Sequence, residues 1–246
     1  MIAVQPGRIL PEAQARRARA FVAGARPTVH ARTAATVMLL RDTRRGLEVY
    51  VHLRHTAMAF AGGMIAFPGG CVDPGDHDPG SESADLPGWA EGLDTDPATS
   101  RAFVRAAIRE THEETGVRLD PADLVPWARW VSPRFEERRY DTWFFLAALP
   151  PGQEAADVSG EVEHVEWLPP ATAIERAGAG ELVMLPPTYA VLDELRGFAT
   201  AAEALAAGVG RVIDTIQPGW VDDGEHVRVL LPSDPDYPGD DPGDLR

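Results

Sequence analysis

The sequence predicts an α/β or α+β fold built on a mixed β-sheet. Runs rich in β-branched and aromatic residues alternate irregularly with helical stretches, which is typical of a sheet whose strands are not all parallel. Of the 246 residues, 44% are hydrophobic, enough to bury one sizeable core. We find no internal repeat. The simplest organisation is a single domain over residues 1–246.

The expected elements follow from periodicity and from turn residues. A short arginine-rich helix is expected over residues 11–23, and residues 55–70 are punctuated by glycine, as in a packed loop with a short strand. Strands are expected over 34–40, 47–53, 124–131, 140–149, 162–168, 212–216 and 226–231. A short helix is expected over 172–176, and a longer helical segment is expected over 188–205.

Composition excludes several classes of function. The formal net charge of −15 argues against nucleic acid or an anionic membrane as the main partner. All 23 basic residues are arginine, which excludes a P-loop lysine and a Schiff-base lysine. The single cysteine, Cys71, excludes an internal disulfide. No apolar run approaches the roughly 20 residues that span a bilayer, so we expect a cytoplasmic protein.

Residues 71–96 differ in composition from the rest of the chain. They are rich in Asp, Gly, Pro and Ser, and they contain eight acidic residues but no arginine. Asp73, Asp76 and Asp78 lack the glycine and terminal glutamate of an EF-hand calcium loop. We therefore predict an exposed, solvated insertion.

A well-defined helix is expected to follow the insertion. Asp96 is a suitable N-cap, Pro97 suits the first helical position, and Gly116 ends the helix after Thr115.

Three glutamates share one face of the last turns of this helix. Glu110 and Glu114 are four residues apart, and Glu113 lies beside Glu110. Like charges at this spacing repel by about 0.2–0.5 kcal/mol per pair. They also lie near the negative end of the helix dipole. Arg109 can pair with Glu113 but cannot neutralise three acids. A solvated acidic face is one interpretation, and a site for a hard divalent cation is the other.

The segment Arg109–Val117 resembles the end of the Nudix box, and Phe67–Gly70 resembles the glycine pair that opens it. Gly70 and Arg109 are 39 positions apart, about 25 more than in an uninterrupted box. Asp76 stands where the box has a glutamate, and we assign it no role. Residues 60–70 and 138–144 further resemble the branch with an interrupted box, which includes peroxisomal coenzyme A diphosphatases and bacterial relatives.

This resemblance implies a Nudix fold, in which a mixed sheet lies between helices. The core would cover about residues 32–185, and the insertion in the box would cover about 71–96. A C-terminal helical extension would follow over 186–232, with an acidic tail over 233–246. The resemblance also allows a homodimer.

The resemblance implies roles for the acidic helix. Glu110 and Glu114 would ligate Mg²⁺ or Mn²⁺ with the Gly69 carbonyl, and Glu113 would share a metal or orient its water. Arg109 would hold a catalytic glutamate in place. Thus Glu110, Glu113 and Arg109 are the candidate catalytic residues, and a distal metal ligand is expected shortly before Trp167. For that ligand we place Glu161 first and Glu163 second.

The expected substrate is a small diphosphate compound. Because arginine binds phosphate in a bidentate manner, we select four candidates near the site: Arg54, Arg134, Arg138 and Arg139. Each could equally be a surface arginine. Coenzyme A or an acyl derivative is the first substrate expectation, and ADP-ribose or a dinucleotide is the second. A catalytically silent binding module of the same fold remains a third reading, against which the intact glutamates speak.

Overall fold

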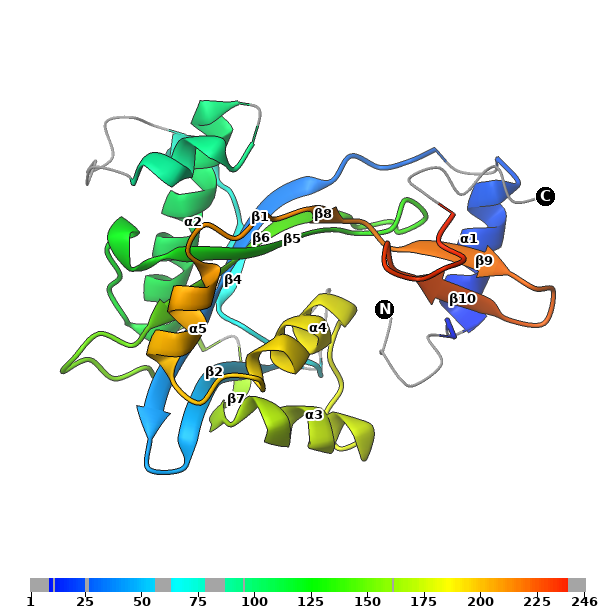
Figure 1. Ribbon diagram of the computed structural model, residues 1–246. Helices are drawn as coiled ribbons and strands as arrows, with labels where there is room; N and C mark the ends of the chain where they lie inside the picture. The colour runs from blue at the N-terminus through cyan, green and yellow to red at the C-terminus, as the bar shows by residue number, and fades with distance from the viewer. Residues whose placement is uncertain are drawn as a thin grey trace.

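A computed structural model describes residues 9–10, 12–24, 27–55, 63–77, 87–94, 96–160 and 162–238. Within them lies an eight-stranded sheet (Figure 1). Six of its strands follow the order β3-β2-β1-β6-β5-β8, and the other two, β4 and β7, pair with β1 and β2 respectively. The strands are β1 (Arg32–Thr43), β2 (Gly46–Arg54), β3 (Ile65–Ala66), β4 (Gly69–Cys71), β5 (Val125–Val131), β6 (Tyr140–Ala148), β7 (Val162–Leu168) and β8 (Thr215–Ile216).

The sheet is mixed, as predicted. The β1–β6 and β5–β8 pairs are parallel, and the other pairs are antiparallel. The strands expected in the first two-thirds of the chain are confirmed, with ends that differ by a few residues. The expected strand over 212–216 is reduced to the two residues of β8.

Helices cover both faces of the sheet, so the predicted sandwich is confirmed (Figure 1). Alternate residues of β1 point to opposite faces. Val37 and Leu39 face a core shared with α2 (Pro97–Thr115), whereas Met38 and Leu40 face a second core. That second core is shared with the helices α3 (Pro170–Gly178), α4 (Pro186–Leu195) and α5 (Ala201–Gly208).

The edge of β1 is divided between two partners, and this division shapes the site. Residues 40–43 of β1 pair with β2, whereas residues 34–36 pair with β4. Between them the carbonyl of Pro68 accepts hydrogen bonds from the Val37 N–H at 2.9 Å and from the Thr36 hydroxyl at 2.6 Å. The glycine pair Gly69–Gly70 is therefore held in a fork between β1 and β2.

The segment 188–205 is helical over most of its length, as predicted, but it is divided between two helices, α4 and α5. Gly197 lies between them, and glycine destabilises a helix interior. The Thr200 hydroxyl then caps α5 by accepting the backbone N–H of Glu203.

A smaller core lies beside the main sheet. The expected N-terminal helix is α1 (Glu12–Val22), and it packs on a hairpin of β9 (Gly219–Asp222) and β10 (Val227–Leu230), at the right of Figure 1. The strand β9 was not predicted, whereas β10 was. Trp220 of β9 contacts the ring of Phe135 edge to face, with 4.8 Å between ring centroids. Of the described helices, none is both long and apolar enough to cross a bilayer.

The segment 71–96 is less exposed than predicted. Its described residues form the short 3₁₀ helices η1 (Pro74–His77) and η2 (Gly88–Gly92), and another, η3 (Pro121–Asp123), precedes β5. Ala90 and Leu93 are buried in the core shared with α2. The prediction of a wholly solvated insertion is therefore wrong, because apolar residues near its end pack under the sheet. Asp78 lies outside the described residues.

Candidate active site

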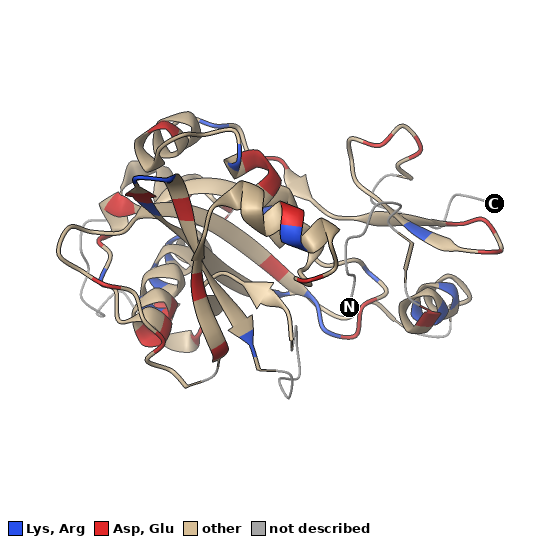
Figure 2. Ribbon diagram, turned by 90° about the horizontal axis from the view of Figure 1, so that it is seen from below, with Lys and Arg blue, Asp and Glu red and all other residues tan. Residues whose placement is uncertain are grey.

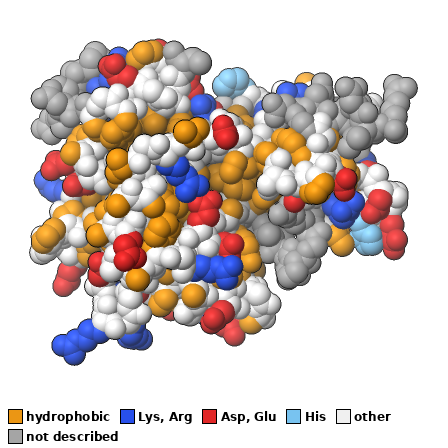
Figure 3. Space-filling view, viewed as in Figure 1, with side chains coloured by type: hydrophobic (Ala, Val, Ile, Leu, Met, Phe, Trp, Pro, Cys, Tyr) orange, Lys and Arg blue, Asp and Glu red, His pale blue; other side chains and the backbone are white. Residues whose placement is uncertain are grey.

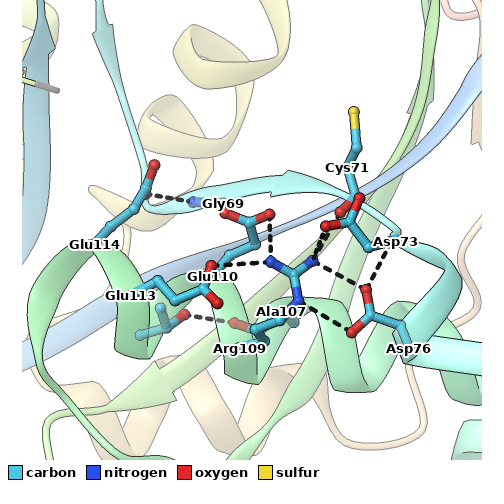
Figure 4. A network of polar contacts seen from close by, with 10 residues as sticks. Gly69, Cys71, Asp73, Asp76, Ala107, Arg109, Glu110, Glu113 and Glu114 are labelled. Carbon is cyan, nitrogen blue, oxygen red and sulfur yellow. Dashed lines mark hydrogen bonds and ion pairs between the residues drawn. The ribbon is translucent and has the colours of Figure 1, made fainter. Parts of the chain in front are cut away.

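Helix α2 has the limits that its sequence predicted. The Asp96 side chain accepts the backbone N–H groups of Ala98 and Thr99, and Gly116 has the left-handed φ of 73° that a C-cap glycine favours. These caps, together with the buried side chain of Phe103, fix the helix against the sheet. The last turns of α2 are thereby directed toward the glycine pair of β4 (Figure 4).

Arg109 organises the acidic end of α2 (Figure 4). Its Nη1 donates to Glu110 Oε1 at 2.9 Å and to Glu113 Oε2 at 3.0 Å. Its Nη2 donates to the Cys71 carbonyl at 3.0 Å. One guanidinium therefore links two of the three glutamates to the end of β4. The catalytic role of these residues stays a prediction.

Asp76 is the principal partner of Arg109, which the sequence analysis missed. Arg109 Nε and Nη2 donate to the two carboxylate oxygens of Asp76 at 3.1 and 3.0 Å. Asp76 is only 5% exposed, so its interpretation as a solvated loop acid is wrong. Its position six residues after Gly70, where the box has a glutamate, was the available signal. The hydrogen bond from Arg109 to Asp76 is also the main cause that raises the pKa of Arg109.

The glycine pair contacts two glutamates directly. The backbone N–H of Gly69 donates to Glu114 Oε2 at 2.9 Å. A Cβ atom at Gly70 would overlap the Glu110 carboxylate, so only glycine at this position allows the carboxylate to lie where it does. The backbone of β4 therefore forms one wall of the acidic site.

The three glutamates differ in exposure and hence in chemistry. The side chains of Glu110 and Glu114 are 16% and 10% exposed, whereas that of Glu113 is 57% exposed. Burial raises the pKa of the Glu110 carboxyl above its usual value, and the hydrogen bond from Arg109 opposes this shift. The carboxylates of Glu110 and Glu114 are thus largely shielded from solvent, whereas that of Glu113 is accessible. Their roles as metal ligands stay predictions.

A cavity of about 640 Å³ opens next to the glycine pair. Arg54 and Arg138 line it together with Gly69 and Gly70, while the three glutamates are not among its lining residues. Figure 3 shows hydrophobic side chains on this face interspersed with charged ones. The volume of the cavity is within the range of small-molecule binding sites. Figure 2 shows acidic residues spread over strands, helices and loops. The cavity lining combines arginines with Glu136 and Glu137.

The structure separates the four arginines into two groups. Arg54 and Arg138 reach the cavity, but Arg134 and Arg139 do not line it. Arg139 is 8% exposed, and its guanidinium donates to the carbonyls of Ser132 and Val29. A role in substrate binding stays a prediction for all four.

The candidates for the distal metal ligand are not tested. Glu161 lies outside the described residues. Glu163 is exposed on β7. Both assignments stay predictions.

Replacing Gly70 with Ala is expected to reduce the diphosphatase activity that the sequence resemblance implies by about 100-fold or more, because the new methyl group must displace the Glu110 carboxylate. Steady-state kinetics with Mg²⁺ would measure the loss. The matched control is Gly75→Ala, where a Cβ meets nothing within 4 Å. Equal activity of Gly70→Ala and wild type would show that catalysis does not require the Glu110 carboxylate in its position next to Gly70.

Comparisons with known proteins show similarity to one family. Residues 99–186 match the family model described as NUDIX domain. The chain is 25% identical over 180 residues to "Putative nudix hydrolase 7" of Caenorhabditis elegans, over 67% of this chain and 60% of that protein. It is 28% identical over 127 residues to "Acyl-coenzyme A diphosphatase NUDT19" of Xenopus laevis, over 48% of this chain and 33% of that protein.

A solved structure is also similar. The crystal structure of a NUDIX hydrolase from Alicyclobacillus acidocaldarius superimposes with a TM-score of 0.58 and 26% identity, over 72% of this chain and 96% of that one. The family model begins at residue 99, so it starts after the insertion and does not include the glycine pair. The contacts between β4 and α2 bring the glycine pair next to the segment that the family model matches.

Proposed function

We propose, from the premise that this chain belongs to the Nudix hydrolase family, that it hydrolyses the diphosphate linkage of a nucleoside diphosphate derivative with Mg²⁺ or Mn²⁺. Coenzyme A or an acyl-CoA is the substrate that we place first. One observation carries the proposal: Glu114 and Glu110 contact Gly69 and Gly70, which line a cavity that also contains arginine, and Arg109 links Glu113 to Glu110.

The residues present fit a hard divalent cation. Glu110 and Glu114 offer carboxylate oxygens with little exposure, and the Glu110 carboxylate lies against the Gly70 backbone. Among the described residues, no three His, Cys, Asp or Glu side chains are grouped tightly enough to hold an ion alone. Mg²⁺ commonly takes one or two carboxylates and completes its shell with water and substrate phosphate. A partial protein shell of this kind supports the proposal.

Each residue has a separate part in the reaction. Glu110 and Glu114, with the Gly69 carbonyl, would hold the cation, which when bound withdraws charge from the phosphoryl oxygens. Glu113 is exposed and accepts the proton of the attacking water. The water oxygen bonds to one phosphorus atom, and the bridging oxygen leaves with the other phosphate. Arg109 fixes Glu110 throughout.

The cavity arginines would bind the phosphates of the substrate. Arg54 and Arg138 both line the cavity, and arginine recognises phosphate oxygens with two parallel N–H donors. With coenzyme A, cleavage would give phosphopantetheine and adenosine 3′,5′-bisphosphate. The likeness to acyl-coenzyme A diphosphatase NUDT19 supports this substrate class, although it covers only 33% of that protein. ADP-ribose and dinucleotides are the alternative substrates.

A substrate panel tests the proposal. Coenzyme A, an acyl-CoA, ADP-ribose and a dinucleotide would be incubated with the protein and Mg²⁺ or Mn²⁺, and products would be separated by chromatography. We expect metal-dependent turnover that is highest with coenzyme A or its acyl form and that EDTA abolishes. Preferred turnover of ADP-ribose would contradict coenzyme A as the substrate but would support the proposed hydrolysis of a diphosphate linkage. No turnover of any compound would favour a silent binding module.

A further inference from the structure

His52 of β2 is a buried polar residue next to the acidic site. Its side chain has no exposed surface, and its Nδ1 lies 3.6 Å from Glu114 Oε2. Among the described residues, neither ring nitrogen has a hydrogen-bond partner. Buried polar atoms in native proteins are nearly always paired, so an unpaired imidazole beside a candidate metal ligand requires an explanation.

The strand position itself does not require histidine. His52 pairs with Val165 of β7 and Ala66 of β3, and its neighbour Val51 is buried in the apolar core of the opposite face. A Leu or Val side chain at this position would carry no desolvation penalty for ring nitrogens. The imidazole therefore costs stability where it stands, as polar groups at functional sites commonly do.

The surroundings of His52 shield its ring from water and restrict its orientation. Burial is the main cause that lowers the pKa of the imidazole to about 4. An imidazole that carries a hydrogen on Nδ1 can donate from that atom. The ring of Tyr50 packs against it edge to face at 5.2 Å, and Trp167 packs against Tyr50 at the same distance. The imidazole thus lies at the end of a row of three rings, with Nδ1 near Glu114.

We propose that His52 is a positioning residue that donates its Nδ1 hydrogen to Glu114 Oε2 and so fixes that carboxylate for the divalent cation. The Gly69 N–H already donates to the same oxygen at 2.9 Å. A side-chain shift of about 0.6 Å brings Nδ1 within hydrogen-bond range. Two donors from two strands then set the orientation of the carboxylate before the cation arrives. This inference rests on the proposed function, because it assumes that Glu114 binds a metal.

Metal affinity measured on three variants tests the inference. His52→Asn keeps an N–H donor near the position of Nδ1, whereas His52→Leu has none. His164→Leu is the control, since His164 is exposed on the neighbouring strand. We expect the Mn²⁺ dissociation constant, measured by electron paramagnetic resonance, to rise about 10–100-fold in His52→Leu. It should stay within a few-fold of wild type in the other two variants. The Tm of His52→Leu should not fall, which separates positioning from structural support.

A second measurement uses the wild-type protein. Nitrogen-15 NMR of histidine-labelled protein with Mg²⁺ should show His52 as the Nδ1–H tautomer, with the signal assigned by its loss in His52→Asn. An Nε2–H tautomer would overturn the inference even if His52→Leu did not fold. An unchanged Mn²⁺ affinity in folded His52→Leu would overturn it as well, while leaving the proposed function intact. A wild-type protein that binds no Mn²⁺ would refute the proposed function and, with it, this role.

Discussion

Glu114→Gln should lose diphosphatase activity by about 100-fold or more while keeping the wild-type fold. Glutamine is nearly isosteric and can still accept the Gly69 N–H, so the contact between β4 and α2 survives. The amide has no charge to offer a divalent cation, and loss of even an indirect ligand contact typically costs 10–100-fold in affinity or rate. Kinetics at saturating Mg²⁺, with circular dichroism as the check of folding, measures both parts.

The control for this variant is Glu175→Gln. Glu175 is an exposed glutamate of α3, on the opposite side of the sheet from α2, so the same chemical change there should leave kcat and KM at wild-type values. Wild-type activity in a folded Glu114→Gln protein would refute the role of Glu114 as a ligand.

Asp76→Ala should lower both stability and activity. The variant removes a bidentate partner from Arg109, and truncating one member of a buried ion pair typically costs about 3–5 kcal/mol. We expect about 3 kcal/mol in the free energy of unfolding, because Arg109 keeps its hydrogen bonds to Glu110 and Glu113. Activity should fall as well, since the guanidinium that holds Glu110 loses its anchor. Urea denaturation and kinetics measure the two effects.

Asp73→Asn is the matched control on the same loop. The Asp73 side chain is 61% exposed and lies 3.8 Å from Arg109 Nη2, so its contribution is that of a surface pair, about 0–1 kcal/mol before screening. If Asp76→Ala were as stable and active as Asp73→Asn, the ion pair would not hold the site together.

Local sequence signals predicted the parts of the structure that depend on neighbouring residues. The limits of α2 followed from a capping aspartate and a terminal glycine, both of which act within three residues. The grouping of Glu110, Glu113 and Glu114 followed from helical periodicity. The resemblance to the Nudix family came from the spacing of these residues around Arg109, and the expectation of a two-sided sandwich came with it.

The sequence could not predict contacts that depend on how distant segments fold. Asp76 and Arg109 are 33 residues apart, and the composition of the loop between them suggested a solvated segment. The burial of His52 depends on Tyr50, Trp167 and the end of α2, which meet only in the folded sheet. The division of the C-terminal helix at Gly197 was readable in principle, but the leucine and alanine pattern on both sides masked it.

The fork in the sheet gives each of the two parts of the box an anchor of its own, in addition to the ion pair that Asp76 of the joining chain makes with Arg109. The glycine pair is fastened to β1 through Pro68 and the β1–β4 pairing, and α2 is fastened through its own apolar side. The entropy of closing a loop grows only slowly with its length. Extra residues can therefore accumulate between two such anchors, so the length of this connection is open to variation while the glutamates stay in register with the glycines.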